Sequence, residues 1–296
     1  MYSKKKFYRN IESVLTKFLI FFKNSKNLDL QKAVQSAIYN TSENEKILFV
    51  NKGNTRFLLH SKDIVSKKIF IDYEFDYKII KKALSLLGKK HKRKTLINIG
   101  ANIGSICIKS VKEKYFNSAI VFEPEEMNFK LLMSNVLINN LENKIIAHKL
   151  ALSNTKTVLK LSLNKKSNLG DNRIINKLNN QKKLKIQKVK SDKLDNFISS
   201  HNKQNTLIFM DVQGHEPYVF IGAKKTLKKK IPIVFEFSPL LLDKNWNRNF
   251  YLLYKNYKYF YDLHNGNKKR LLNKDNIISL FNKLKLEKNY TDLMIV

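Results

Sequence analysis

Cysteine is almost absent from this chain, whose 296 residues include only Cys107. A single cysteine can neither form an intrachain disulfide nor supply the ligands of a zinc knuckle, so both kinds of cross-linked domain are excluded. Cys107 falls just inside a predicted helix, where a buried and unreactive thiol is expected. This pattern is typical of a reducing compartment, and we predict a cytoplasmic location.

Long hydrophobic runs are also absent. The most apolar stretch, residues 14–22, is too short to cross a bilayer, contains Lys17 and is followed by polar residues without a small-residue cleavage site. We interpret it as an amphipathic helix docked on the protein, with a peripheral anchor at the inner face of the membrane as the alternative. Any membrane contact is therefore expected to be peripheral and to use residues 1–40, a basic and mostly helical segment.

Arginine is scarce although positive charge is abundant. Lysine and arginine together number 57 against 24 acidic residues, a formal charge of +33, but only six of the 57 are arginine. Arginine is favoured for bidentate contacts with phosphates and bases, whereas this excess is carried by lysine along the whole chain. The charge fits a compositional bias better than a recognition surface, so we do not expect specific nucleic-acid binding.

Proline is rare as well, and all four prolines lie between residues 124 and 239. Two of them directly follow acidic residues, in the pairs Glu123-Pro124 and Glu216-Pro217. Because proline restricts the backbone, rigid segments are concentrated in this part of the chain. This concentration supports a functional site there.

The chain does contain a glycine turn between a strand and a helix, over residues 95–105 (T-L-I-N-I-G-A-N-I-G-S). The apolar run before Gly100 is typical of a parallel strand buried on both faces. Gly100 can adopt a positive φ and removes side-chain bulk where a ligand approaches the backbone, and Gly104 lets the next helix pack closely on the strand. A nucleotide-like ligand fits such a turn, which is also common in plain strand-to-helix connections.

Strand and helix patterns alternate downstream of this turn, which predicts a parallel sheet with helices on both faces. The predicted strands are residues 95–99, 119–122, 144–152, 206–210, 231–237, 257–262 and 291–296, and the predicted helices include 77–87, 126–139 and 276–286. In the helix over 126–139, the predicted inward face consists of Phe129, Leu132, Met133, Val136 and Leu137. Two asparagines of the same helix, Asn135 and Asn139, are expected to stabilise packing rather than to touch substrate.

The remaining segments complete the predicted organisation. Short β-rich runs between residues 46 and 72 predict small antiparallel strands, the last of them over 68–72. Residues 159–163 and 184–189 form an extra pair around a loop, 164–183, that is either a lid over a site or mobile. We divide the chain into a helical and short-stranded appendage, residues 1–72, and an α/β domain, residues 73–296.

Polar or glycine-rich sequence follows four of the predicted strands, at Gly100–Gly104, Glu123-Pro124, Asp211–Glu216 and Glu236. Ligands of open α/β sheets bind beyond the carboxyl ends of the strands, near the point where strand order reverses. Glu123 stands 19 residues after Gly104, where a carboxylate can accept hydrogen bonds from both hydroxyls of an adenosine ribose. A helix-capping role is the alternative for Glu123. Because the spacing Gly-x-x-x-Gly departs from the dinucleotide pattern, S-adenosylmethionine is favoured over NAD.

A series of sequence blocks together resembles the FkbM-type methyltransferases. The blocks are I-N-I-G-A-N-I-G-S (97–105), V-F-E-P (121–124), L-x-x-N-V-x-x-N (132–139), S-D-K-L-D (191–195), F-M-D-V-Q-G-H-E (209–216) and I-V-F-E (233–236). The resemblance covers about residues 75–239. It implies a Rossmann-like, class I methyltransferase with a seven-stranded sheet, which uses S-adenosylmethionine and acts on a hydroxyl of a sugar, glycolipid or secondary metabolite. Family members usually carry an acid where this chain has Asn98.

The site residues follow from these blocks. The residues expected to contact the cofactor are Asn98, Gly100, Ala101, Asn102, Gly104, Glu123, Pro124 and Ser153. The catalytic candidates are Asp211, His215, Glu216 and Glu236. A general base among them would take the proton of the acceptor hydroxyl, and His215 is the first candidate because its unperturbed pKa is near neutrality. Asp211 and Glu216 are expected to line the acceptor pocket. Mg²⁺ is a further candidate ligand, with no ligand set assigned.

We therefore predict an S-adenosylmethionine-dependent O-methyltransferase that acts on a sugar, glycan or glycolipid. Two alternatives remain open. One is an RNA methyltransferase, to which the positive charge points. The other is a non-catalytic Rossmann-like binding protein that keeps the fold and has lost activity through Asn98.

Overall fold

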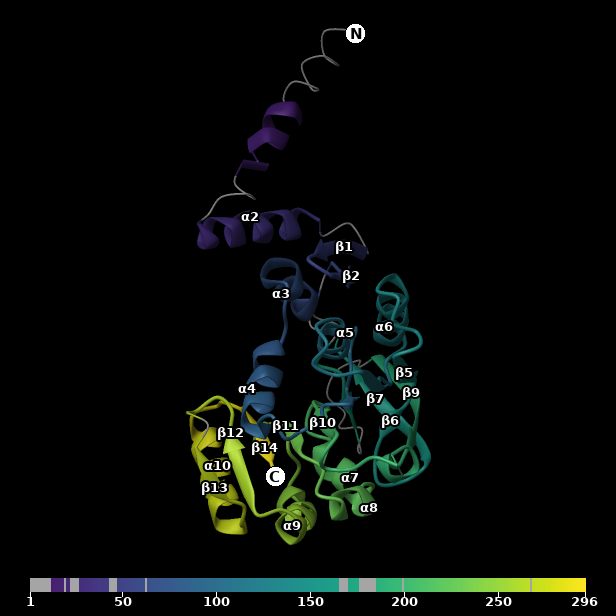
Figure 1. The fold of residues 1–296 in the computed structure, drawn as a ribbon, viewed down its shortest axis with the longest axis vertical. Helices are drawn as coiled ribbons and strands as arrows, with labels where there is room; N and C mark the ends of the chain where they lie inside the picture. Colours follow the sequence, from purple (N-terminus) through teal and green to yellow (C-terminus); the bar gives the residue numbers. More distant parts are fainter. Residues whose placement is uncertain are drawn as a thin grey trace.

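The computed structural model describes residues 12–18, 20–21, 27–42, 47–61, 63–164, 170–175, 185–198, 200–266 and 268–296 (Figure 1). At its centre is a sheet of eight strands, in the spatial order β13 (Lys269–Leu271), β12 (Tyr259–Asp262), β14 (Thr291–Ile295), β11 (Ile233–Phe237), β10 (Thr206–Met210), β3 (Thr95–Ile99), β4 (Ser118–Phe122) and β5 (Ile145–His148). The strands from β11 to β5 are parallel, whereas β14 runs antiparallel to both neighbours. Read from β5, the parallel strands follow the doubly wound order, which reverses between β3 and β10.

Helices cover both faces of this sheet, because its central strands are apolar on both sides. Leu96 packs into one core, and its neighbour Ile97 packs into a second core on the opposite face. The first core takes side chains from α3 (Ile64–Asp72), α4 (Tyr77–Leu87), α5 (Ser105–Lys112) and α6 (Glu126–Ile138). The second core takes side chains from α7 (Glu216–Ile221), α8 (Lys224–Lys228), α9 (Trp246–Asn256) and α10 (Lys274–Leu286). The predicted α/β fold is confirmed, and the short strand β13 extends the expected seven strands to eight.

Before the central sheet, α2 (Leu28–Thr41) is followed by β1 (Ile47–Lys52) and β2 (Thr55–His60), which form the predicted antiparallel hairpin. The predicted strand over residues 68–72 is wrong, because these residues belong to α3. This helix begins after Asp63, whose carboxylate accepts a hydrogen bond of 2.8 Å from the backbone N–H of Ser66. Val65 and Ile69, four residues apart, are buried on one helical face. A capping residue and helical spacing therefore outweighed the β-rich composition.

A smaller sheet has the order β6 (Ala151–Leu152), β9 (Lys185–Asp192), β7 (Thr157–Leu163) and β8 (Arg173–Ile174). Its antiparallel pair β7–β9 confirms the predicted extra pair of strands. The predicted strand over residues 144–152 is divided, because the chain turns where Leu150 N–H donates to the carbonyl of His148 at 3.0 Å. The first part joins the central sheet as β5, and the second pairs with β9 as β6. After β9 the chain forms a 3-10 turn, Leu194–Asn196.

The predicted inward face of α6 is confirmed in part, since Leu132 and Val136 are buried. Met133 and Leu137 are exposed, whereas Asn135 and Asn139 are buried. The Asn135 side chain accepts a hydrogen bond from Leu58 N–H at 2.6 Å and donates to the Leu58 carbonyl at 3.1 Å. Asn139 makes the same pair of bonds to Arg56, at 3.0 and 2.7 Å. The two amides thus satisfy the backbone of β2 as a neighbouring strand would, which confirms their expected packing role.

The N-terminal helix stands apart from the rest of the protein. Residues 12–18 and 20–21 are helical and exposed, and Figure 1 shows them extending beyond α2. The predicted docking of this helix on the protein is not seen among the described residues. Within the described ranges, no helix is both long enough and apolar enough to cross a membrane.

Replacing Asn135 is expected to destabilise the fold. The substitution Asn135→Ala leaves Leu58 N–H, the Leu58 carbonyl and the Ile103 carbonyl without the amide partner that each has in the structure. Because unpaired buried polar groups are costly, we expect the free energy of unfolding to fall by about 2–4 kcal/mol in urea titrations. Met133→Ala on the exposed face of the same helix is the control, with an expected change within about 0.5 kcal/mol. Equal losses in both variants would contradict the role given to Asn135.

Candidate functional site

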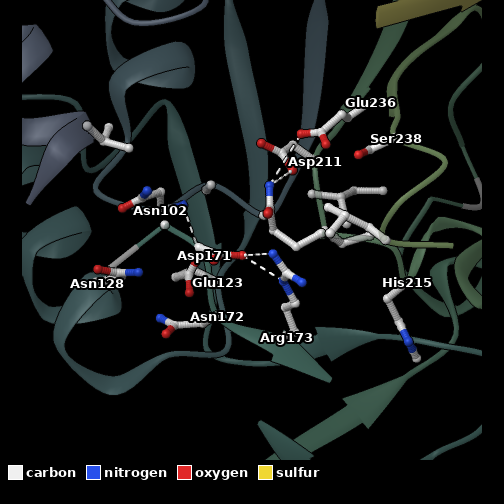
Figure 2. A pocket seen from close by; sticks show the side chains of 18 of the residues that line it. Asn102, Glu123, Asn128, Asp171, Asn172, Arg173, Asp211, His215, Glu236 and Ser238 are labelled. Carbon is white, nitrogen blue, oxygen red and sulfur yellow. Dashed lines mark hydrogen bonds and ion pairs between the residues drawn. The ribbon is translucent and has the colours of Figure 1, made fainter. Parts of the chain in front are cut away.

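A cavity of about 470 Å³ opens at the carboxyl ends of the central strands (Figure 2). Its size is within the range of small-molecule and cofactor sites, and it lies where strand order reverses, as open α/β sheets predict. Eight of the residues predicted for the site line it: Gly100, Ala101, Asn102, Glu123, Pro124, Asp211, His215 and Glu236. Four others, Asn98, Gly104, Ser153 and Glu216, are not among its lining residues.

The glycine turn lines the cavity. Glycine is required there for a different reason than the sequence suggested. Gly100 has a φ of +78°, and a Cβ placed on it would lie 1.8 Å from the backbone carbonyl oxygen of Asp211. The missing side chain therefore makes room for the adjacent strand end rather than for a ligand. Gly104 has a φ of +90°, and a Cβ there would lie 2.8 Å from the Leu132 side chain of α6. Helix packing therefore leaves no room for a side chain at Gly104, as expected. The element that packs against it is α6 rather than the strand.

Glu123 is held at one end of the cavity by backbone amides. Its two carboxylate oxygens accept hydrogen bonds from Asn102 N–H at 2.8 Å and from Glu125 N–H at 2.9 Å. Burial raises the pKa of Glu123 to about 7. The alternative reading of Glu123 as the cap of α6 is wrong, because the side chain of Glu125 has that role through a 2.7 Å bond from Asn128 N–H. The Asn128 side chain is a further hydrogen-bond partner of Glu123, so the carboxylate keeps about one lone pair for a ligand hydroxyl.

A second group of carboxylates occupies the other end. Gln213 donates from its side-chain nitrogen to Asp211 at 2.8 Å and to Glu236 at 3.3 Å, so one amide holds the two acids together. Figure 2 shows Asp211 and Glu236 side by side, with Ser238 beside them. Burial raises the pKa of Asp211, and burial together with the charge of Asp211 raises the pKa of Glu236. Both effects favour keeping a proton on this pair in the absence of a cation.

Two further acids of the cavity were missed by the sequence reading. Asp76 precedes α4 in the left-handed conformation, with a φ of +53°, and burial next to Asp292 and Asp211 raises its pKa to about 7. Asp292, in β14, lies 2.8 Å from the Nε2 of His264, and this bond raises the pKa of the histidine. A signal for Asp292 was present, since an aspartate inside an otherwise apolar strand is unusual.

Glu216 was expected in the acceptor pocket, but it instead holds the loop after β10. Its carboxylate is buried and accepts hydrogen bonds from Val212 N–H at 3.0 Å and Gly214 N–H at 3.4 Å. Burial raises its pKa to about 7. These contacts shape the segment that carries Asp211 and Gln213, so Glu216 is a positioning residue.

His215 lies on the cavity wall away from the acidic pair. Figure 2 shows its imidazole pointing away from Asp211 and Glu236. Its Nε2 lies 2.9 Å from the hydroxyl of Ser153, and its ring stacks on Tyr218 at 4.8 Å. Burial lowers the pKa of His215 to about 4, which makes it a weaker base than a free histidine. The acidic pair is therefore the better placed base, and Ser153 contacts His215 rather than the cavity.

Asn98 lies on β3 between Val121 of β4 and Phe209 of β10. Its side chain is 1% exposed, and in the described part of the chain its Oδ1 has no hydrogen-bond partner. The predicted direct contact between Asn98 and the cofactor is not supported, because the residue does not line the cavity.

One described portion of the predicted lid, residues 170–174, lines the cavity next to Glu123. Within it, Arg173 forms a 2.6 Å ion pair with Asp171 (Figure 2). The other residues of the predicted loop, 165–169 and 176–183, lie outside the described residues. Across the described ranges, no group of three or more histidine, cysteine, aspartate or glutamate residues is arranged to hold a metal ion. The structure therefore gives no support for Mg²⁺.

Comparison with known proteins gives one family match. Residues 98–265, more than half of the chain, match the methyltransferase FkbM domain. No curated protein sequence matches the chain.

Several solved structures are similar in fold. One is a methyltransferase FkbM from Methylobacillus flagellatus KT, with a TM-score of 0.44, 13% identity, and coverage of 90% of this chain and 60% of that one. TYW2 from M. jannaschii, in complex with AdoMet, has a TM-score of 0.40 and 12% identity, with 85% of each chain covered. A tRNA methyltransferase from B. subtilis, TrmK, has a TM-score of 0.36 and 11% identity, with 73% and 64% covered. The chain spans only 60% of the length of the first of these proteins, and similarities this distant add nothing to the family match.

The two histidines described above are expected to titrate in opposite directions. His215 should stay neutral until the pH falls to about 4, because burial disfavours its charged form, whereas His264 should titrate above its ordinary range because Asp292 stabilises the imidazolium. Carbon-detected NMR titration of the imidazole signals measures both pKa values, with His215→Gln and His264→Gln assigning the signals. A His215 pKa near 6.5 would contradict the buried, neutral state.

Proposed function

Because the chain belongs to the FkbM methyltransferase family, we propose that it transfers a methyl group from S-adenosylmethionine to a hydroxyl of a sugar, glycan or glycolipid. The observation that carries this proposal is the cavity at the switch point, with Glu123 at one end and the Asp211–Glu236 pair at the other. Both ends are built from strand termini that the family match includes. The proposal covers the cofactor and the acceptor class, which the family alone leaves open.

The residues of the cavity fit the donor. Glu123 is held by the amides of Asn102 and Glu125 at the end of β4, where its carboxylate can accept a hydrogen bond from a hydroxyl of an adenosine ribose. S-adenosylmethionine supplies an electrophilic methyl group on a sulfonium and carries a further positive charge on its ammonium group. The carboxylates near the opposite end can accept such charge, and a bound cation would lower their raised pKa values.

Charge is distributed unevenly between the cavity and the rest of the protein. Six acidic residues line the cavity, Asp76, Glu123, Asp171, Asp211, Glu236 and Asp292, whereas its cationic lining residues are Arg173 and Lys288. The whole chain has the opposite balance, with 57 lysines and arginines against 24 acids. An acidic cavity repels a phosphate-rich acceptor, so it favours a neutral or cationic acceptor over RNA.

Proton removal is assigned to the acidic pair. The acceptor hydroxyl would lie between the methyl group and Asp211 or Glu236, and one carboxylate would accept its proton as the carbon–oxygen bond forms. A cationic donor would favour the ionised form of the pair, which leaves a carboxylate able to accept the proton. Gln213 keeps the two acids in one geometry, and most of the rate gain would come from alignment of donor and acceptor.

Donor binding should depend on Glu123. We expect Glu123→Ala to weaken S-adenosylmethionine binding by about 30-fold or more in calorimetric titrations, because the ribose hydroxyls lose their charged acceptor. Glu126→Ala is the matched control, since Glu126 lies on the first turn of α6 outside the cavity and pairs with Lys130 and Lys149. Unchanged affinity in a folded Glu123→Ala protein would count against the donor site, and no binding by the wild-type protein would favour the non-catalytic alternative.

Methyl transfer should depend on Asp211. In assays with methyl-labelled donor at saturating concentration, neutral saccharide or glycolipid acceptors should be labelled, and Asp211→Asn should lower kcat by about 100-fold or more. Glu216→Gln keeps an oxygen for the loop amides and should retain kcat within a few fold. Labelling of RNA with no labelling of saccharides would overturn the acceptor class and support the RNA alternative.

A further inference from the structure

The N-terminal helix presents large apolar side chains to solvent. Val14, Leu15, Phe18 and Phe21 have exposed fractions of 66%, 55%, 57% and 70%. Figure 1 shows this helix reaching outward past α2, away from the central sheet. Exposed aromatic and aliphatic side chains in such a group mark an interaction surface rather than ordinary scatter.

Four of the five exposed apolar residues described in this helix share one helical face. Val14, Leu15, Phe18 and Phe21 lie within a stripe roughly 120° wide at about 100° per residue. Ser13, Thr16 and the fifth exposed apolar residue, Ile20, lie on the opposite side, and Lys17 flanks the stripe. The helix is therefore amphipathic, and its apolar stripe is not covered by the central part of the protein.

The charge around the stripe identifies what it contacts. Residues 1–26 contain seven basic residues, Lys4, Lys5, Lys6, Arg9, Lys17, Lys23 and Lys26, and one acidic residue, Glu12. A basic amphipathic helix with phenylalanines on its apolar face is complementary to an anionic lipid surface, where the apolar face enters the acyl boundary and the lysines meet the headgroups. A second copy of this chain would bring a segment of the same positive charge, and the two would repel.

We propose that the helix over residues 12–21 binds the chain to the surface of an anionic lipid bilayer, lying in the plane of the interface. No helix within the described residues is long and apolar enough to cross a bilayer, so the proposed contact is at the membrane surface. This surface is separate from the cavity, so the proposal holds whether or not methyl transfer does. If the proposed function also holds, membrane binding brings the cavity to acceptors carried by lipids.

Vesicle flotation of the full chain tests the proposal. We expect binding to phosphatidylcholine vesicles that contain 30% phosphatidylglycerol, weak binding to phosphatidylcholine alone, and a loss of about 10-fold or more in 1 M NaCl. The double variant Phe18→Ser, Phe21→Ser should bind the anionic vesicles at least about 10-fold more weakly. Its far-UV circular dichroism and unfolding midpoint should match the wild type, because both side chains are exposed.

A matched control replaces exposed apolar residues elsewhere. Tyr251 and Leu286 have exposed fractions of 52% and 85%, and the double variant Tyr251→Ser, Leu286→Ser should bind anionic vesicles as the wild type does. The proposal is overturned if the wild type does not float with anionic vesicles, or if the Phe18/Phe21 and control variants bind equally. It is also overturned if the phenylalanine substitutions abolish a dimer, measured by light scattering, without changing vesicle binding.

Discussion

The site depends on the close approach of two strand ends, β3 and β10. The backbone of β10 reaches the glycine turn where Asp211 N–H donates to the Ile99 carbonyl at 3.0 Å, and the Asp211 carbonyl then occupies the space that a side chain on Gly100 would fill. Because strand order reverses between these two strands, their loops leave in opposite directions and the cavity opens between them. Because Gly100 has no Cβ, the end of β10 can approach the glycine turn. The turn and the acidic end of the cavity therefore form a single site.

Folding also separates charge within the molecule. The chain is strongly basic, yet the walls of its cavity are acidic, since carboxylates from four strand ends, the start of α4 and the β8 region converge there. Most of these carboxylates are kept from water, so their pKa values rise and they gain from a cationic ligand. The net charge of the chain therefore does not indicate the charge of the ligand, whereas the acidic cavity favours a cationic one.

Short-range patterns predicted most of the fold and part of the site. Several elements lie where they were predicted: the strand before Gly100, the helix over residues 77–87, and the strands that lead to Glu123 and Asp211. Their patterns, burial on both faces and helical periodicity, depend on residues close together in the sequence. Some errors arose where a distant partner decided the outcome, since Asn135 and Asn139 turn toward β2. The error over residues 68–72 was local, because Asp63 caps a helix there. His215 and Glu216, although both belong to the motif over residues 209–216, point to Ser153 and to their own loop.

The sequence by itself determined the parallel α/β class, the glycine turn and the family, since these depend on residue types at fixed spacing. Only the tertiary structure decided which polar residues share the cavity. Asp76 and Asp292 are more than 200 residues apart in the chain, and neither is marked by a motif, yet both meet Asp211 at one sheet edge. The physical reason is that burial and charge act through space, so the pKa and the role of a carboxylate follow from its neighbours in the fold rather than from its neighbours in the chain.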